Sequence, residues 1–473
     1  VMVTLFLLTT IGSRDASPER VFDAGHKSLM IIGGADMALL LGIGLLWYIS
    51  GTFTMSAITP QSGGMATAAF VLIMLGAISK AGAMPLHSWI PNMAEAAPTS
   101  VMAFLPASLD KLLGIYLLSR MVLNFYEFSP GCPMSLLLMI IGAVTIIAAV
   151  MMAMVQHDMR KLLSFHAVSQ VGYMVLGIGT GTPIGVAGGI FHMLNHSIYK
   201  SGLFLSGGSV EHGTGENDLG KLGGLAKAMP ITFVACLIGA LSISGIPPFN
   251  GFFSKWMVYQ GILEAGASQY WIFLIAAMFG SALTLASFVK LIHSTFLGQK
   301  PRELEGVKES GISMTIPLIV LAALCVVFGV FAQLPITQFI APVVGPVTVS
   351  GVWSPTLATV LLLVALAIGL IIYLIGRIRV TREVPMYIGG ETLDPVETSV
   401  PGTRFYDTIR FMGVFSGLYR RGEEAVFDIY SYGKYIFPVT EVLRTLHNGR
   451  LMTYVSWCLW GLIILFLILV GVG

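Results

Sequence analysis

Two histidines and a lysine recur at helical spacing in the segment HMLNHSIYK, as His192, His196 and Lys200. At 3.6 residues per turn, positions i, i+4 and i+8 form one stripe along a helix face, with neighbours about 6 Å apart. Both residue types exchange protons, and this spacing leaves room for water between them. The stripe therefore predicts a proton path. Its alternatives are a polar contact between helices and a metal site, for which no third ligand is evident.

Two further lysines each lie close to a proline in an apolar segment. Lys80 precedes Pro85 in SKAGAMPLH, and Lys255 follows Pro248 in SGIPPFNGFFSK. Proline removes a backbone donor and clashes with the preceding turn, so both helices should break there. Broken helices at membrane depth line buried, hydrated cavities, and the shared pattern indicates an internal repeat. The alternative for each lysine is a side chain that extends to the membrane surface.

Adjacent charges in SLDKLL also lie within an apolar segment. Asp110 and Lys111 point about 100° apart on a helix, so they cannot face each other. Lys111 then needs a partner from another helix, and we expect it to belong to the proton path. Asp110 and Asp36 fit internal counter-charges and polar packing equally well. Three more ionisable residues suit packing or a place near the membrane surface as well as proton transfer: His166, Lys290 and His293.

These residues are embedded in a very apolar chain. Of its 473 residues, 55% are hydrophobic and 11% are charged, and the mean hydropathy is +0.84. A soluble domain would carry about a quarter charged residues. Because a bilayer core requires about 20 apolar residues per helix, we predict an all-α, polytopic transmembrane bundle of about 11–12 spans. The qualifying segments are residues 28–49, 64–83, 99–124, 134–155, 161–180, 184–209, 229–263, 270–297, 313–332, 355–376 and 452–471.

Two apolar segments do not qualify as spans. Residues 333–354 are rich in proline and glycine, and we expect a loop or a re-entrant piece there. Residues 1–12 are too short to cross the bilayer alone, and the N-terminus lacks the basic region of a signal peptide. This segment predicts either a truncated chain or preceding helices on a separate polypeptide.

Lysine and arginine alternate between the loops when residues 1–12 are counted as a span. By the positive-inside rule the basic loops are cytoplasmic and both ends of the chain lie outside, with Arg120 as the one exception. The cytoplasmic set comprises Arg14, Arg20, Lys27, Arg160, Lys161, Lys221, Lys227, Lys300, Arg302, Lys308 and a segment from Arg377 to Arg450.

The sequence offers no ligand set for a redox centre. Its four cysteines are scattered, without the C-x-x-C spacing of a cluster or zinc site. It has no phosphate-binding loop, dinucleotide fingerprint or haem-attachment motif. We therefore expect no cofactor and no metal on this chain, and no nucleic-acid partner.

Four segments resemble the antiporter-like, proton-translocating subunits of respiratory complex I, of membrane-bound nickel–iron hydrogenases with formate hydrogenlyases, and of multisubunit Na⁺/H⁺ antiporters. They are SKAGAMPLHSWIPNMAEAAPTSV, HDMRKLLSFHAVSQVGYM, HMLNHSIYKSGLFLSGGSV and SGIPPFNGFFSKW, in the order of the family. The resemblance implies two inverted five-helix repeats, each with a discontinuous helix. We accordingly divide the chain into repeats at 1–180 and 181–312, additional spans at 313–376, a cytoplasmic lateral segment at 377–451 and a final anchor at 452–473.

By position, the resemblance implies a hydrophilic axis across the membrane. Lys80 and Lys255 match the lysines of the two broken helices, and the family's glutamate partner for the first would precede this chain. That leaves the partner of Lys80 open unless another chain supplies it. The implied proton-relay residues are Lys80, Lys111, His192, His196, Lys200 and Lys255.

The C-terminal part of the sequence indicates which group within the resembling family this chain is most similar to. Residues 404–449 mix aromatic and charged side chains and predict an amphipathic helix along the membrane surface. It is similar to the lateral helix of complex I and to the tail of hydrogenase-associated subunits. YIGGETLDP and FYDTIR favour the hydrogenase-type group.

The sequence as a whole predicts a proton-translocating subunit of a multisubunit membrane redox complex in the prokaryotic inner membrane. Its partners would be other membrane subunits, a peripheral redox arm on neighbouring chains, the lipid bilayer, and H⁺ or, in its place, Na⁺. One alternative is a subunit of a Na⁺/H⁺ antiporter without redox chemistry. Another is a passive scaffold whose polar axis no longer functions.

Overall fold

The computed structural model describes residues 17–266, 270–347, 355–375 and 402–433, and residues 452–463 except 454 and 458. Within these ranges the chain forms helices and no β-strand, which confirms the predicted all-α class. Seven helical segments of this part are long and apolar enough to cross a membrane: 18–50, 64–81, 99–125, 133–154, 159–179, 271–297 and 312–330. The predicted segment 1–12 and most of the predicted anchor lie outside the described residues.

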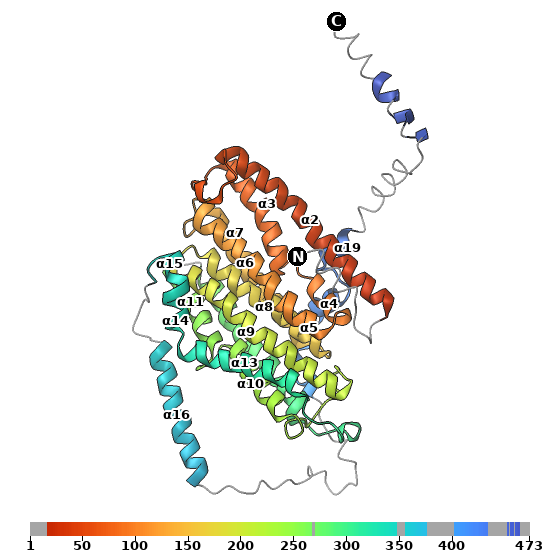
Figure 1. Ribbon diagram of the computed structural model, residues 1–473, viewed down its shortest axis with the longest axis vertical. Coiled ribbons are helices and arrows are strands. Elements are labelled where there is room, and N and C mark those ends of the chain that lie inside the picture. Colours follow the sequence, from red (N-terminus) through yellow and green to blue (C-terminus); the bar gives the residue numbers. More distant parts are fainter. Residues whose placement is uncertain are drawn as a thin grey trace.

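The first two helices pack side by side as a hairpin (Figure 1). They are α2 (Pro18–Ser50) and α3 (Gly64–Ala81), with a short turn, η1 (Met55–Ala57), between them. Helix α2 begins well before the predicted start at residue 28. Ser17 caps it, because its hydroxyl accepts from the backbone of Arg20, and Pro18 suits the first helical position. Lys27, assigned to a loop from the sequence, therefore lies inside a helix.

Helix α8 (Met159–Gly179) forms the centre of the bundle and is buried along its whole length. It packs between α7 (Pro133–Met154) and α9 (Pro183–Thr214). Two glycines permit the close contact with α7, because a Cβ at Gly172 would lie 2.6 Å from the carbonyl oxygen of Gly142. The residues on the inward face of α9 consequently lie against the core of the molecule.

Two helices are discontinuous, as the prolines predict. The first is divided into α3 and α4 (Trp89–Ala96), and the second into α10 (Pro230–Ser244) and α11 (Asn250–Glu264). The predicted span 229–263 is therefore two helices. Gly82 and Gly245 end the first half of each in the left-handed region, both with φ of 81°, a conformation that glycine adopts without strain.

The remaining helices complete the bundle. They are α5 (Thr99–Phe104), η2 (Leu105–Leu109), α6 (Asp110–Arg120), η3 (Met121–Phe125), α12 (Trp271–Ile292), η5 (His293–Leu297), η6 (Arg302–Leu304) and α13 (Ile312–Val330). Helix α16 (Pro355–Ile375) lies apart from the bundle (Figure 1). The prediction of a loop or re-entrant piece at 333–354 needs correction, because residues 333–344 form α14 (Gln333–Pro335), η7 (Ile336–Ile340) and α15 (Ala341–Val344). Ile336 and Ile340 bury this segment against Ile184 and Phe253 of α9 and α11.

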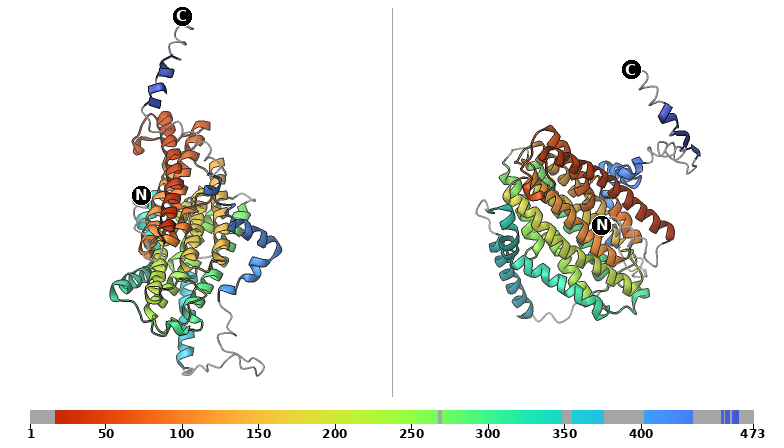
Figure 2. Two further views of the ribbon diagram at one scale, coloured as in Figure 1. Left: turned by 90° about the vertical axis from the view of Figure 1, so that its right-hand side faces the viewer. Right: turned by 45° about the horizontal axis from the view of Figure 1, so that its top comes forward.

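Residues 402–433 form a strap against the bundle (Figure 2). In place of the single amphipathic helix predicted at 404–449, the described part is η8 (Gly402–Arg404) and three short helices, α17 (Asp407–Phe411), α18 (Gly413–Glu423) and α19 (Ile429–Gly433). Tyr406 donates to the carbonyl of Ala286 on α12 at 2.6 Å, and Tyr419 to that of Met151 on α7 at 3.2 Å. Breaks between the short helices let the strap follow several helix ends, which one straight helix could not do.

Candidate functional site

Lys80 has a counter-charge within the chain. It lies in the last turn of α3 and forms an ion pair with Asp36 of α2, with side chains 16% and 29% exposed. The partner that the sequence left open is therefore Asp36. This pairing also decides between the two roles considered for Asp36 and shows that Lys80 does not extend alone to the membrane surface.

Lys111 is fully buried on α6 and reaches the end of the first broken helix. Its Nζ donates to the carbonyl of Ala81, the last residue of α3, at 3.2 Å. The last carbonyls of a helix lack partners within the helix, so a break supplies acceptors at membrane depth. Lys111 thus has its partner on another helix, as predicted. Asp110 beside it is also buried, and its carboxylate receives no hydrogen bond from the described residues.

The predicted stripe on α9 faces the core, and all three of its side chains are buried. His192 joins three helices, because Nδ1 lies 2.9 Å from Oγ of Ser254 on α11 and Nε2 lies 3.2 Å from Oε1 of Gln170 on α8. Lys200 lies between aromatic rings, with Nζ 5.4 Å from the ring centroid of Phe204 and 5.7 Å from that of Phe288. Rings can stabilise a buried cation through their negative faces.

Lys255 lies in the first turns of α11, just beyond the second break, and is buried. Its Nζ is 4.6 Å from the centroid of the Tyr173 ring on α8. The break admits its stem, because a Cβ at Gly245 would lie 3.0 Å from Cδ of this lysine. The alternative of a side chain at the membrane surface is therefore wrong for Lys255.

The three additional candidates have different environments. His166 is buried and its Nε2 lies 2.7 Å from Oγ of Ser287. Lys290 is also buried, and its Nζ donates to the carbonyls of Met154 at 2.5 Å and Gln156 at 2.8 Å. Those carbonyls lie at the C-terminal end of α7, where a cation is favourable, so Lys290 caps that helix and does not extend to the surface. His293 is partly exposed and packs on the ring of Phe405.

Aromatic side chains connect these groups into one file. Helices α6 and α9, which carry Lys111 and Lys200, pack against each other. Tyr199 bridges the two histidines, with its ring 5.4 Å from that of His196 and its hydroxyl 3.3 Å from Nε2 of His192. The structure therefore places Lys111, the α9 stripe and Lys255 in one buried region. Lys80, with Asp36, lies in the last turn of α3, the helix whose end Lys111 contacts.

The sequence reasoning missed the aromatic and hydroxyl members of this file. The ring of Tyr173 lies 5.6 Å from that of His192 and beneath Lys255, and the ring of Phe288 lies 4.7 Å from that of His166 and beneath Lys200. Tyr173 could have been found from the sequence, because it is part of SQVGY in one of the four segments that carry the family resemblance. The sequence gives no such indication for Phe288, because phenylalanine is a common packing residue in membrane helices.

A sequence model described as NADH:quinone oxidoreductase/Mrp antiporter, transmembrane, matches residues 2–284. The chain belongs to this family. Among curated relatives, it is 32% identical over 334 residues to hydrogenase-4 component B of Escherichia coli, covering 66% of this chain and 49% of that protein. It is 32% identical over 345 residues to one of the Na⁺/H⁺ antiporter subunits of Alkalihalophilus pseudofirmus, covering 67% and 42%. The chain thus spans about half the length of these relatives.

Solved structures share the fold of this antiporter-like protein. An archaeal membrane-bound sulfane sulfur reductase complex matches with a TM-score of 0.79 and 25% identity, over 99% of this chain and 78% of the other. The Mrp complex of Dietzia sp. matches with a TM-score of 0.67 and 25% identity, over 73% and 72%. These likenesses confirm the predicted family and its polytopic helical architecture.

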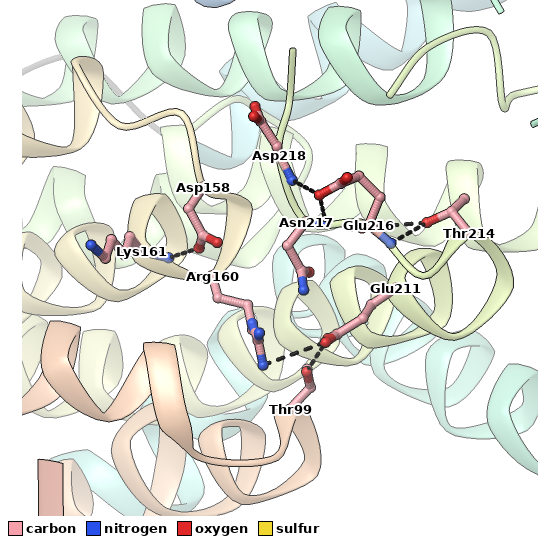
Figure 3. Close-up of polar contacts among 9 residues, drawn as sticks. All are labelled: Thr99, Asp158, Arg160, Lys161, Glu211, Thr214, Glu216, Asn217 and Asp218. Atoms are coloured by element: carbon pink, nitrogen blue, oxygen red, sulfur yellow. Dashed lines mark hydrogen bonds and ion pairs between the residues drawn. The ribbon is translucent and has the colours of Figure 1, made fainter. Parts of the chain in front are cut away.

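Charged and polar side chains contact one another at the N-terminal ends of α5 and α8 and at the C-terminal end of α9 (Figure 3). Glu211 accepts from the hydroxyl of Thr99 at 2.8 Å and lies 3.4 Å from Nη1 of Arg160. Asp158 caps α8 by accepting from the backbone of Lys161 at 2.8 Å. Arg160 and Lys161, which the sequence analysis assigned to a loop, therefore lie in the first turn of α8. In the described residues no cluster of three His, Cys, Asp or Glu side chains could hold a metal ion.

The strap meets the first broken helix through one carboxylate. Asp428 forms an ion pair with Lys27 of α2 and accepts from the hydroxyl of Ser88 at 2.6 Å. Ser88 directly precedes α4, so this carboxylate contacts the start of the second half of the first broken helix. Burial acts to raise the pKa of Asp428, but the hydrogen bonds from Lys27 and Ser88 hold it below its ordinary value.

Asp428→Asn should loosen the strap. Hydrogen bonds to charged groups contribute about 1.5–3 kcal/mol, so opening of residues 413–433 should rise roughly tenfold or more, measured as amide hydrogen exchange. Because the folded pKa lies below the unfolded value of about 3.9, this contribution is present above that pH and is lost as pH falls through the folded pKa. Exchange should therefore be flat from about pH 5 to 8 once the intrinsic rate is divided out. The exposed Glu424→Gln is the control, and unchanged exchange in Asp428→Asn would contradict the contact.

Proposed function

We propose that this antiporter-like protein translocates protons as one subunit of a multisubunit membrane redox complex. One observation supports this above all: Lys111, the α9 stripe and Lys255 are buried on α6, α9 and α11, which pack in that order between the first broken helix and the second. Ionisable residues inside membrane helices are costly and are retained for ion pathways or proton relays. Lysine and histidine can release and regain a proton as nearby charges change, and water can connect them where side chains do not touch.

In this proposal the roles follow the order in which the helices pack. Lys80 with Asp36 and then Lys111 occupy the first break, and Lys200, His196 and His192 carry protons along α9. Lys255 receives them at the second break. Electron transfer on neighbouring chains would shift charge or conformation beside this file, and the coupling must act in both directions. The chain itself would carry no redox cofactor and would work with other membrane subunits and a peripheral redox arm in the prokaryotic inner membrane.

One solved structure that matches nearly the whole chain belongs to a redox complex, whereas respiratory complex I from Thermus thermophilus, also a redox complex, matches 73% of it. The sulfane sulfur reductase complex, an archaeal respiratory assembly, matches 99% of this chain, whereas the Mrp complex matches 73%. A second function, Na⁺/H⁺ exchange without redox chemistry, is favoured by relatives named as Na⁺/H⁺ antiporter subunits, with 32% and 34% identity. Hydrogenase and complex I relatives at 32% and 33% are equally similar, so the hydrogenase-type subgroup stays a prediction.

Reconstitution of the purified complex into liposomes separates the two functions. Reduced methyl viologen would supply electrons, with protons, a short-chain quinone or polysulfide as parallel acceptors, and a trapped dye would report internal pH. We expect electron transfer to move protons in sodium-free buffer. A pH change that needs a Na⁺ gradient and ignores electron transfer would instead identify an exchanger.

A further inference from the structure

Three hydroxyl groups from three helices form a connected chain beside Lys255. The hydroxyl of Tyr259 on α11 lies 2.7 Å from Oγ of Ser281 on α12, and that of Tyr173 on α8 lies 2.9 Å from the same atom. Tyr173 also donates to the carbonyl of Ala277 at 2.7 Å. None of these groups was singled out by the spacing of charged residues.

This chain begins at the lysine of the second break. Tyr173 holds its ring 4.6 Å from Nζ of Lys255, and Tyr259 follows Lys255 by one helical turn, so the two project from the same face of α11. Lys255 thus lies over the ring of one member of the hydroxyl chain and one helical turn before another.

The direction of the chain is outward. Helix α11 runs from the break toward the connection to α12, and residues 265–270 contain no lysine or arginine. By the positive-inside rule that connection lies on the side opposite the cytoplasm. Tyr173 is fully buried and Tyr259 is partly exposed, so the chain leads from the core toward the surface.

We propose that Tyr173, Ser281 and Tyr259 form the outward proton exit of Lys255, an inference that rests on the proposed proton translocation. A hydroxyl both donates and accepts, so it can take one proton while it releases another. Because Nζ of Lys255 has no hydrogen-bond partner among the described residues, its ammonium gives a proton to the Tyr173 oxygen through one water molecule. The proton of Tyr173 then passes to Ser281, that of Ser281 to Tyr259, and that of Tyr259 to outer water. Each hydroxyl ends neutral, and Lys255 ends as an amine.

The direction of the hydrogen bond that Tyr173 donates means that its hydroxyl must rotate before proton transfer. Tyr173 at rest donates to Ala277, so its hydroxyl must rotate toward Ser281 before it can pass a proton outward. Such rotation is fast compared with helix motions. The exit therefore needs no rearrangement of the bundle.

Substitutions at Ser281 and Tyr259 test the exit in the reconstituted complex. Ser281→Ala and Tyr259→Phe keep the packing but interrupt the chain, and Ser281→Thr restores a hydroxyl at the same atom. A positioned proton-transfer group contributes about 10²–10⁴-fold, and water can replace part of it, so we expect roughly tenfold fewer protons moved per electron in the first two variants. Ser281→Thr should return the ratio to near that of the wild type.

Tyr126→Phe is the matched control, because Tyr126 is buried and its hydroxyl has no hydrogen-bond partner among the described residues. Normal pumping by Ser281→Ala and Tyr259→Phe would overturn the exit. A loss that comes with lower thermal stability and is not recovered by Ser281→Thr would also overturn it, since that result marks a packing contact. Failure of the wild-type complex to move protons would refute the proposed function itself. If Ser281→Ala and Tyr259→Phe pump normally while Lys255→Ala does not pump, only the exit is refuted.

Discussion

Lys200→Ala is expected to lower proton translocation by the reconstituted complex at least about tenfold, with assembly preserved. The side chain lies midway along α9 and is fully buried between the rings of Phe204 and Phe288. Its loss removes the titratable group that lies between Lys111 and the α9 histidines in the proposed path. Because alanine is a strong helix former, α9 itself should remain intact.

Two further variants separate proton transfer from charge and from packing. Lys200→Arg keeps a positive charge that is not given up in proteins, so it should block proton transfer as Lys200→Ala does. Ser206→Ala removes another buried polar group of α9, whose hydroxyl donates to the backbone of Gly202 at 2.8 Å, and should pump normally. Proton-to-electron ratios and the subunit content of the purified complex are measured together. A fully active Lys200→Ala complex would contradict the proton path and favour a passive scaffold.

The ion pair between Asp36 and Lys80 gives the second large expected effect. Asp36→Asn should both destabilise the complex and abolish most of its pumping, because Lys80 then lacks a counter-charge at membrane depth. Lys80→Met should stop pumping as well, since it removes the first proton-carrying group. In the double variant neither unpaired charge is present, so its thermal midpoint should exceed that of either single variant.

A double-mutant cycle measures this coupling. Contacting residues in one ion pair have interaction energies of about 0.5–3 kcal/mol, whereas independent sites are additive. The exposed Asp23→Asn on the same helix controls for general loss of charge. If the effects of Asp36→Asn and Lys80→Met on the midpoint simply add, the two residues do not pair in the assembled complex and Lys80 has another partner.

The four lysines of the proposed path have different neighbouring groups. Lys80 faces a carboxylate, Lys111 faces a helix-end carbonyl, and Lys200 and Lys255 face aromatic rings. A carboxylate stabilises a positive charge more strongly than a ring does. Of these four lysines, Lys80 alone forms an ion pair in the described part of the chain.

Much of this arrangement could be predicted because it depends on short stretches of sequence. Apolar runs of sufficient length define most spans, and Pro85 and Pro248 define the two breaks, since a proline disrupts the helix in which it lies. The stripe on α9 follows from helical spacing alone. These features need no knowledge of which helices are neighbours.

Partners across helices could not be predicted in this way. Asp36 pairs with a lysine 44 positions away, and Asp428 pairs with one 401 positions away. Lys290 finds its acceptors at the end of α7 because α12 packs there, although its position near a helix end suggested the membrane surface. Local sequence determines where each helix begins, breaks and places its charges. The partner of each charge depends on which helices pack together, and that is decided by the shape and burial of surfaces far apart in the chain.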